Sequence, residues 1–157
     1  MTDSIASRLK DFDSRLADPE ALRLAFGCAC AERVRHLLED EAVIRCLDTL
    51  SAFVAGRTDR IALEAVTAEA AALANHHQGS RSLDGVGHAA VSASYAVANA
   101  LAGRAVQAAD YAAYAAVYGD GGYGAVSDPE SFVPEHAWQL ATLERLAKDR
   151  GARTDSP

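Results

Sequence analysis

Large aromatic side chains, proline, cysteine and basic charge are all scarce in this sequence. Its 157 residues include four phenylalanines, one tryptophan, four prolines and three cysteines. A core with so few large side chains has to be stabilised by many close contacts between small groups. The net charge of −7 argues against a general nucleic-acid binder or an anionic-membrane binder, because both need a basic surface. An acidic chain is better suited to a basic partner.

Long apolar runs and a disulfide framework are also missing. No stretch approaches the roughly 20 apolar residues of a membrane span, and the N-terminus lacks the apolar core of a secretory signal. Cys28 and Cys30 sit two apart on a predicted helix and point away from each other, and Cys46 stands alone. We therefore expect reduced, buried cysteines in a cytoplasmic protein that does not contact membranes.

Alanine is abundant instead, and it is densest between His88 and Tyr118. Alanine is the best helix former, and its small Cβ lets helix axes approach to the low end of the usual ~8–10 Å range. The sequence therefore predicts two tightly packed central helices, with Gly103 as a break or kink between them.

Helical periodicity extends over most of the chain, and no useful strand alternation occurs. Asp18, Pro19 and Glu20 form a helix start, and Thr58 is the predicted cap of a helix that runs through Ile61 and Leu73. We predict an all-α fold, a single compact bundle of about six or seven helices over residues 18–150. Residues 1–17 form a short helix or an arm, and residues 151–157 a disordered tail. The predicted bundle helices span about 18–38, 40–55, 58–77, 86–102, 104–118 and 134–150.

No recognisable catalytic or metal-binding motif stands out. The glycines of 119–124 follow a helix rather than a strand, so this segment is predicted to be a flexible connection within an irregular stretch, not a phosphate-binding loop. Metal binding by His76, His77 and His88 with a nearby cysteine has the wrong spacing for the common zinc and di-iron sites. We predict neither catalysis nor a cofactor.

Two charged residues interrupt otherwise apolar helical stripes. Arg33 lies within the stripe of the first long helix, and Asp110 lies within the stripe of the 104–118 helix. Each side chain can extend to water at the end of the bundle. Alternatively, the two form a buried polar pair, because a lone buried charge is too costly.

Three further groups of residues are candidates for interaction. A polar face on the 86–102 helix and a tyrosine row on the next helix can either hydrogen-bond between helices or form a binding face, since tyrosine is enriched at interface hot spots. An acidic corner lies between the first two bundle helices and is either a solvated turn or a partner-binding site. The groups are His88, Ser92, Tyr95 and Asn99; Gln107, Tyr111, Tyr114 and Tyr118; and Glu39, Asp40 and Glu41.

Several segments resemble the bacterial immunity proteins of polymorphic toxin systems, an alanine-rich, all-helical family. The segments are ALRLAFGCACAERVRHLLE at 21–39, AFVAGR at 52–57, EAVTAEAAALA at 64–74, and GHAAVSASYAVANALAG with AADYAAYAAVY within 87–118. The resemblance implies a cytosolic protein that binds and occludes a toxin domain without catalysis. A basic toxin such as a nuclease would suit the acidic chain.

Two other functions are compatible with the same residues. The tyrosine row could join copies of the chain in a helical scaffold or self-associating module. A small-ligand-binding helical enzyme, with a pocket near His88 and Asp110, is the second alternative.

Overall fold

The computed structural model describes residues 2–75 and 86–151, and it confirms the all-α bundle. The described residues contain no strand. The segment between the predicted 58–77 and 86–102 helices lies outside them, as do His76, His77 and tail residues 152–157. The helices are α1 (Thr2–Asp13), α2 (Pro19–Arg33), η1 (Arg35–Leu37), α3 (Glu41–Val54), α4 (Arg60–Asn75), α5 (Val86–Leu101), α6 (Ala105–Val126), η2 (Pro129–Phe132) and α7 (Val133–Asp149), where η denotes a 3-10 helix.

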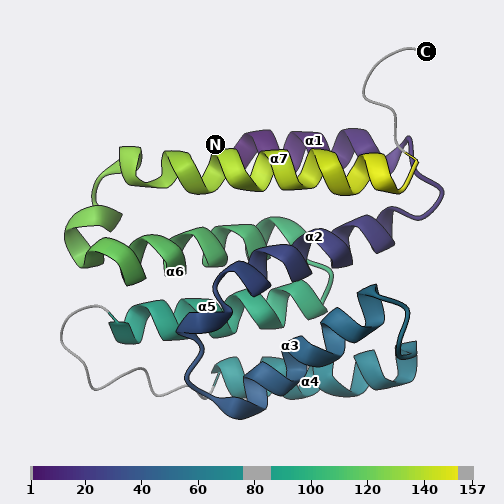
Figure 1. The fold of residues 1–157 in the computed structure, drawn as a ribbon, viewed down its shortest axis with the longest axis horizontal. Helices are drawn as coiled ribbons and strands as arrows, with labels where there is room; N and C mark the ends of the chain where they lie inside the picture. Colours follow the sequence, from purple (N-terminus) through teal and green to yellow (C-terminus); the bar gives the residue numbers. More distant parts are fainter. Residues whose placement is uncertain (1, 76–85, 152–157) are drawn as a thin grey trace.

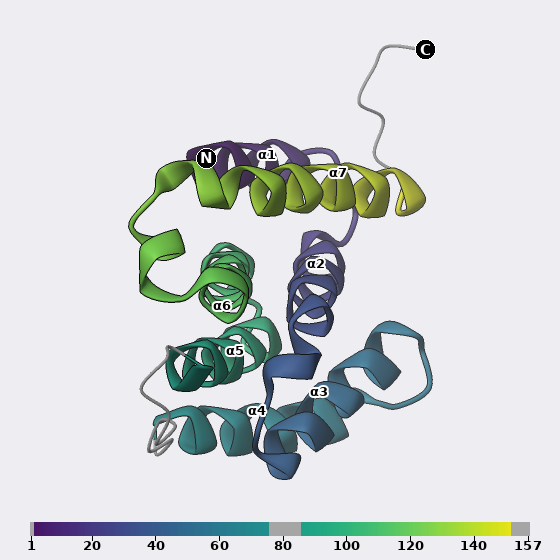
Figure 2. The same ribbon diagram turned by 60° about the vertical axis from the view of Figure 1, so that its left-hand side comes forward.

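The helices are arranged in three layers. In Figure 1, α1 and α7 lie side by side along one edge, while α3 and α4 form the opposite edge. Figure 2 shows α2, α5 and α6 between these two layers. The contact between α5 and α6 is the most extensive in the molecule, which confirms the predicted pair of central helices.

Small residues allow the central helices to approach closely. Eleven of the buried alanines belong to α5 and α6, and most are less than 3% exposed: Ala89, Ala90, Ala93, Ala96, Ala100, Ala105, Ala108, Ala109, Ala112, Ala113 and Ala115, with Ala98 partly buried beside them. At the crossing of α2 and α5, a Cβ on Gly27 would lie only 3.1 Å from the Cα of Ala100. The packing therefore leaves no room for larger side chains at this crossing.

Capping side chains begin three of the helices. The Asp18 carboxylate accepts a hydrogen bond from the Ala21 backbone N–H at 3.1 Å, and the Asp40 carboxylate accepts one from Ala42 at 2.8 Å. The start of α4 differs from the prediction, because Asp59 rather than Thr58 accepts a bond from a first-turn N–H, that of Ala62. Short polar side chains at these positions satisfy backbone donors that have no partner within the helix.

The N-terminal segment is a helix rather than an arm. Ile5, Leu9 and Phe12 of α1 are each at most 3% exposed. Arg8 also forms an ion pair with Glu144 of α7. The core thus extends beyond the predicted 18–150 boundary.

Two predicted helix boundaries are wrong. The first long helix ends at Arg33 and is followed by the short η1, instead of running to residue 38. The predicted irregular stretch at 119–134 is largely helical, because α6 continues to Val126 across a kink at Gly122, where φ is 65° and ψ is −151°. The helix continues despite the low helix propensity of its glycines, and Gly119 allows Leu37 to come close, since an added Cβ would lie 3.0 Å from the Leu37 side chain.

The buried face of α4 also differs from the predicted one. Ile61 is 78% exposed, whereas Leu63, Ala70 and Ala74 are buried. Alanine occurs on every side of this helix, so its periodicity does not identify the face that contacts α3 and α5.

The three cysteines are buried and free, as predicted. Burial raises the pKa of the Cys28 and Cys30 thiols, and it is the main cause that raises the pKa of Cys46 to about 12. Reactive thiolates are therefore disfavoured at all three positions.

Candidate protein-binding surface

Aromatic rings from α5, α6, η2 and α7 gather on one side of the bundle. Each ring lies within 6.3 Å of another, measured between ring centres. We define the aromatic surface as the eight residues His88, Tyr95, Tyr111, Tyr114, Tyr118, Tyr123, Phe132 and His136.

Tyr118 is the centre of the larger group of rings. It stacks on His88 with a ring-centre distance of 5.3 Å, and it meets Tyr114 and Tyr123 edge-on at 4.8 and 5.3 Å. Tyr114 continues the group to Phe132 at 6.3 Å. Stacked and edge-on geometries are both favourable for aromatic pairs, so these contacts hold the side chains in defined positions.

A second pair of rings lies further along the same helices. Tyr95 of α5 stacks on Tyr111 of α6 with ring centres 5.2 Å apart. Tyr111 and Tyr114 line a common hollow of about 380 Å³ together with Ser92, Gln107 and Asp110. This hollow connects the two groups of rings into one surface.

The aromatic surface leaves large apolar groups in contact with solvent. Tyr111 and Tyr114 are each 38% exposed and Tyr123 is 52% exposed, while the adjoining Val133 is 45% exposed. By contrast, Tyr118 is only 8% exposed and supports the others from below. A cluster of exposed aromatic residues is typical of a protein-binding site.

Burial and hydrogen bonding shift two pKa values within the surface. The hydrogen bond with Tyr114, whose hydroxyl oxygen lies 3.5 Å away, is the main cause that raises the pKa of Tyr118 to about 12. Burial lowers the pKa of His136, whereas the carboxylates of Asp110 and Glu135 act in the opposite direction. These shifts favour the neutral forms of both side chains at pH 7.

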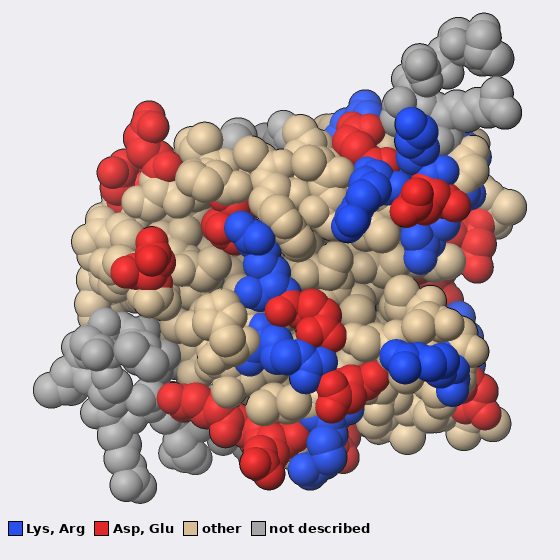
Figure 3. Space-filling view, viewed as in Figure 1, with Lys and Arg blue, Asp and Glu red and all other residues tan. Residues whose placement is uncertain are grey.

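Acidic charge surrounds the aromatic surface. No lysine or arginine occurs between Ala105 and Glu144, whereas six acidic residues do: Asp110, Asp120, Asp128, Glu130, Glu135 and Glu144. Glu135 and Glu144 form ion pairs with arginines. Figure 3 shows acidic but no basic side chains at its left-hand end, over the end of α6 and η2. The surface therefore presents aromatic groups in a negative potential.

The expectation of a buried pair between Arg33 and Asp110 is wrong. Both residues are exposed. The Arg33 guanidinium donates two hydrogen bonds to the Glu135 carboxylate, at 2.9 and 3.1 Å, and lies 4.3 Å from the ring centre of Trp138. Each charge reaches water at the edge of its helix, which was the alternative expectation.

The predicted polar face of α5 is divided between core and surface. Ser92 is buried, His88 is exposed, and Tyr95 and Asn99 are partly buried. The Asn99 amide donates to the Tyr95 carbonyl oxygen at 2.8 Å, which is a bond within α5 and not between helices. His88 and Tyr95 therefore belong to the aromatic surface, whereas Ser92 lines the hollow beside it.

The acidic corner has a partly structural role. Asp40 caps α3, so its carboxylate stabilises the helix start. Glu39 and Glu41 are exposed and are the two members of this corner that a partner could reach.

Sequence reasoning missed Tyr123, Phe132 and His136, because all three were assigned to an irregular stretch or to the edge of the last helix. The signal that could have found them is the absence of lysine and arginine between Arg104 and Arg145, which marks one continuous acidic and aromatic segment. The continuation of α6 to Val126 then brings Tyr123 against Tyr118.

Within residues 2–75 and 86–151, no group of three or more His, Cys, Asp or Glu side chains could hold a metal ion. None of the described helices has the length and apolar character needed to cross a membrane. Neither a family model, nor a curated protein, nor a solved structure matches this chain.

Proposed function

We propose that this chain is an immunity protein that binds a bacterial toxin and blocks it by occlusion, without catalysis. The observation that carries the proposal is the aromatic surface, in which Tyr111, Tyr114 and Tyr123 are exposed although apolar. Tyrosine side chains supply a large contact area at low entropic cost, and they dominate the binding energy of many interfaces.

The ring contacts favour a surface that is ordered before binding. Tyr114 is held between Tyr118 and Phe132, with ring centres 4.8 and 6.3 Å away. Side chains that are already restrained lose less entropy when a partner covers them, so more of the contact energy contributes to affinity. A rigid surface of this kind suits a protein that has to stay bound to its target.

The charge around this surface favours a basic target. Asp120 and Glu130 are exposed beside the aromatic residues, and the whole chain has a net charge of −7. A nuclease toxin has a basic groove for phosphates, and opposite charge accelerates association with such a surface. Glu39 and Glu41 add to this long-range attraction from the end of η1.

Co-expression with the toxin encoded beside this gene tests the proposal. We expect wild-type protein to restore growth and to co-purify with the toxin, and the double variant Tyr111→Ala/Tyr114→Ala to do neither. The matched control is Ile61→Ala, because Ile61 is the most exposed large apolar residue and lies on α4, outside the aromatic surface. Circular dichroism must show that all three proteins are folded.

Self-association through the same surface is the competing outcome. If the neighbouring protein neither binds nor kills, and sedimentation gives a dimer that Tyr111→Ala/Tyr114→Ala converts to monomer, the scaffold function replaces the immunity function. The acidic charge around the aromatic surface disfavours such a dimer, since it would bring like charges together.

A further inference from the structure

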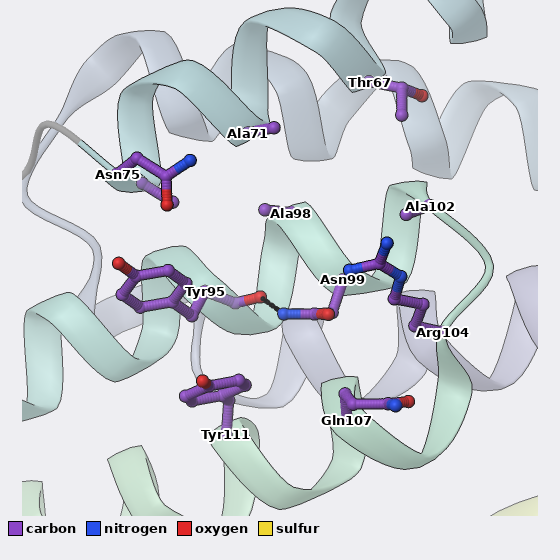
Figure 4. A pocket seen from close by; sticks show the side chains of 11 residues that line it. Thr67, Ala71, Asn75, Tyr95, Ala98, Asn99, Ala102, Arg104, Gln107 and Tyr111 are labelled. Carbon is purple, nitrogen blue, oxygen red and sulfur yellow. Dashed lines mark hydrogen bonds between the residues drawn. The ribbon is translucent and has the colours of Figure 1, made fainter.

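A second hollow, of about 400 Å³, lies where α4, α5 and α6 meet. Figure 4 shows Tyr95 and Tyr111 at one end of this pocket and Arg104 at the other, with Asn99 between them. Its volume falls in the range of small-molecule sites, which is roughly 300–1,000 Å³. The pocket shares Tyr95 and Tyr111 with the aromatic surface, and unlike the first hollow it is also lined by α4.

Arg104 has no ion-pair partner within residues 2–75 and 86–151. Six other arginines form ion pairs: Arg8, Arg15, Arg23, Arg33, Arg35 and Arg60. Arg104 pairs with no carboxylate among the described residues, and none of the residues that line the pocket is acidic. In a chain with a net charge of −7, an arginine facing a pocket without a carboxylate is a specific feature. It favours a ligand that carries negative charge.

Uncharged polar side chains also line the pocket, with Gln107 on the side of Arg104 and Asn75 at the tyrosine end. The side-chain amides of Asn75 and Gln107 line the pocket and form no hydrogen bond with any described residue. The Asn99 amide nitrogen is bonded to the Tyr95 carbonyl oxygen, which fixes its position beside Arg104. A few converging polar groups in a partly apolar pocket are typical of a site that orients a small ligand.

The remainder of the pocket is flat and apolar. Ala71, Ala98 and Ala102 contribute only methyl groups to its lining, and the stacked rings of Tyr95 and Tyr111 form its far end. Methyl groups and aromatic faces contact planar hydrophobic bodies well. The polar end and the flat end together match a molecule with one acidic group and one ring system.

We propose that this pocket binds a small aromatic carboxylate. Its carboxylate pairs with Arg104, and its ring lies against the alanines and the tyrosine pair. One guanidinium balances one negative charge, so a monoanionic carboxylate fits better than a dianionic phosphate, which would retain an uncompensated charge. The proposal is independent of toxin binding, and its test needs no protein partner.

Calorimetric and NMR titrations of the full chain test this site. The probes are benzoate, 2-naphthoate and indole-3-acetate, each compared with its neutral amide. We expect at least one carboxylate to bind with a dissociation constant below 1 mM, and its amide to bind at least about tenfold more weakly, because loss of a charge-assisted hydrogen bond costs roughly 1.5–3 kcal/mol. Shifted amide resonances should map to α5 and to the start of α6.

Arg104→Gln should weaken binding by about tenfold or more, because it removes the positive charge and keeps a polar side chain. The control is Arg57→Gln, since Arg57 is also exposed but lies in the turn between α3 and α4. The Arg57→Gln variant should bind the carboxylate as tightly as the wild type does. Ala98→Leu, which fills the pocket floor, should abolish binding. The proposal is overturned if no carboxylate in the panel binds, if acid and amide bind equally, or if Arg104→Gln binds as wild type does.

Discussion

On the inner side of α6, Ala105, Ala108, Ala112 and Ala115 are each at most 3% exposed, whereas on its outer side Tyr111 and Tyr114 are each 38% exposed. One helix thus presents alanines to the core and exposes Tyr111 and Tyr114 to solvent, although Tyr118 of the same helix is only 8% exposed. Burying these tyrosine side chains would stabilise the fold more than exposing them does. Folding alone therefore does not explain their position.

The two sides of α6 therefore have different roles, one in stabilising the fold and the other in interaction. The alanine side lets α6 approach α5 and α2 closely, so the helices are held by many short contacts. The tyrosine side contributes less to the core and keeps apolar area accessible. Exposed apolar area that is already ordered is better explained by a partner than by folding.

The largest expected effect is on the alanine side. Ala108→Leu should destabilise the protein by about 3 kcal/mol, because the extra methylenes have no space in the core. Ala68→Leu is the control, since Ala68 is exposed on α4 and should change stability by less than about 0.5 kcal/mol. Urea denaturation measures both. Equal stabilities for the two variants would mean that the α5–α6 contact has space for a larger side chain, which would contradict the close packing of the alanine side.

At the end of α6, two nearby glycines should respond in opposite ways. Gly122 has a φ of 65°, so Gly122→Ala should cost about 2 kcal/mol through backbone strain. Gly124 has open space around its Cα, and Gly124→Ala should be neutral or stabilise by up to about 1 kcal/mol through helix propensity. Melting temperatures of the two single variants, compared with that of the wild type, check both expectations. A tolerated Gly122→Ala would show that the kink does not define where Tyr123 packs.

Substitutions of two charged residues, Arg33 of α2 and Asp110 of α6, should have smaller effects on stability. Arg33→Met should cost about 1 kcal/mol, because it removes a bidentate ion pair with Glu135 and the contact with Trp138. Asp110→Asn should change stability by less than about 0.5 kcal/mol, because Asp110 is exposed. A coupling energy between Arg33 and Asp110 in a double-mutant cycle would restore the discarded buried pair.

The smallest effect is a pH dependence at the edge of the aromatic surface. Burial lowers the pKa of His136 in the folded state, so the unfolded state binds a proton more readily. Stability should therefore decrease as the pH falls through about 6.5, the ordinary histidine value. His136→Phe, which keeps a ring against Phe132, should reduce this decrease. Melting temperatures of the wild type and of His136→Phe at pH 7.5 and 5.5 measure the change. An equal decrease in the two proteins would contradict the burial of His136.

Local sequence rules predicted most of the fold but less of the surface. Asp18 with Pro19 and Asp40 mark helix starts because their side chains cap nearby N–H groups without help from tertiary structure. Ile61 and Arg33 were misplaced for another reason. In an alanine-rich helix the apolar residues point in all directions, and only the neighbouring helices determine which face is buried.

Local sequence rules likewise predicted only part of the candidate surface. Tyr111, Tyr114 and Tyr118 were recognised as one row because they share a helix. Tyr123 and Phe132 join them only because α6 continues past Gly119, which lies close to Leu37, and turns at Gly122. Such long-range contacts are not encoded in local propensity.

The most direct test of toxin binding is co-purification of the neighbouring gene's product with the wild-type, Tyr111→Ala/Tyr114→Ala and Ile61→Ala proteins. The account predicts that wild type and Ile61→Ala form a stable complex, whereas the double tyrosine variant stays folded but dissociates at least about tenfold faster, since aromatic anchors act mainly on dissociation. Equal dissociation rates for all three proteins, or no complex with wild type, would contradict it.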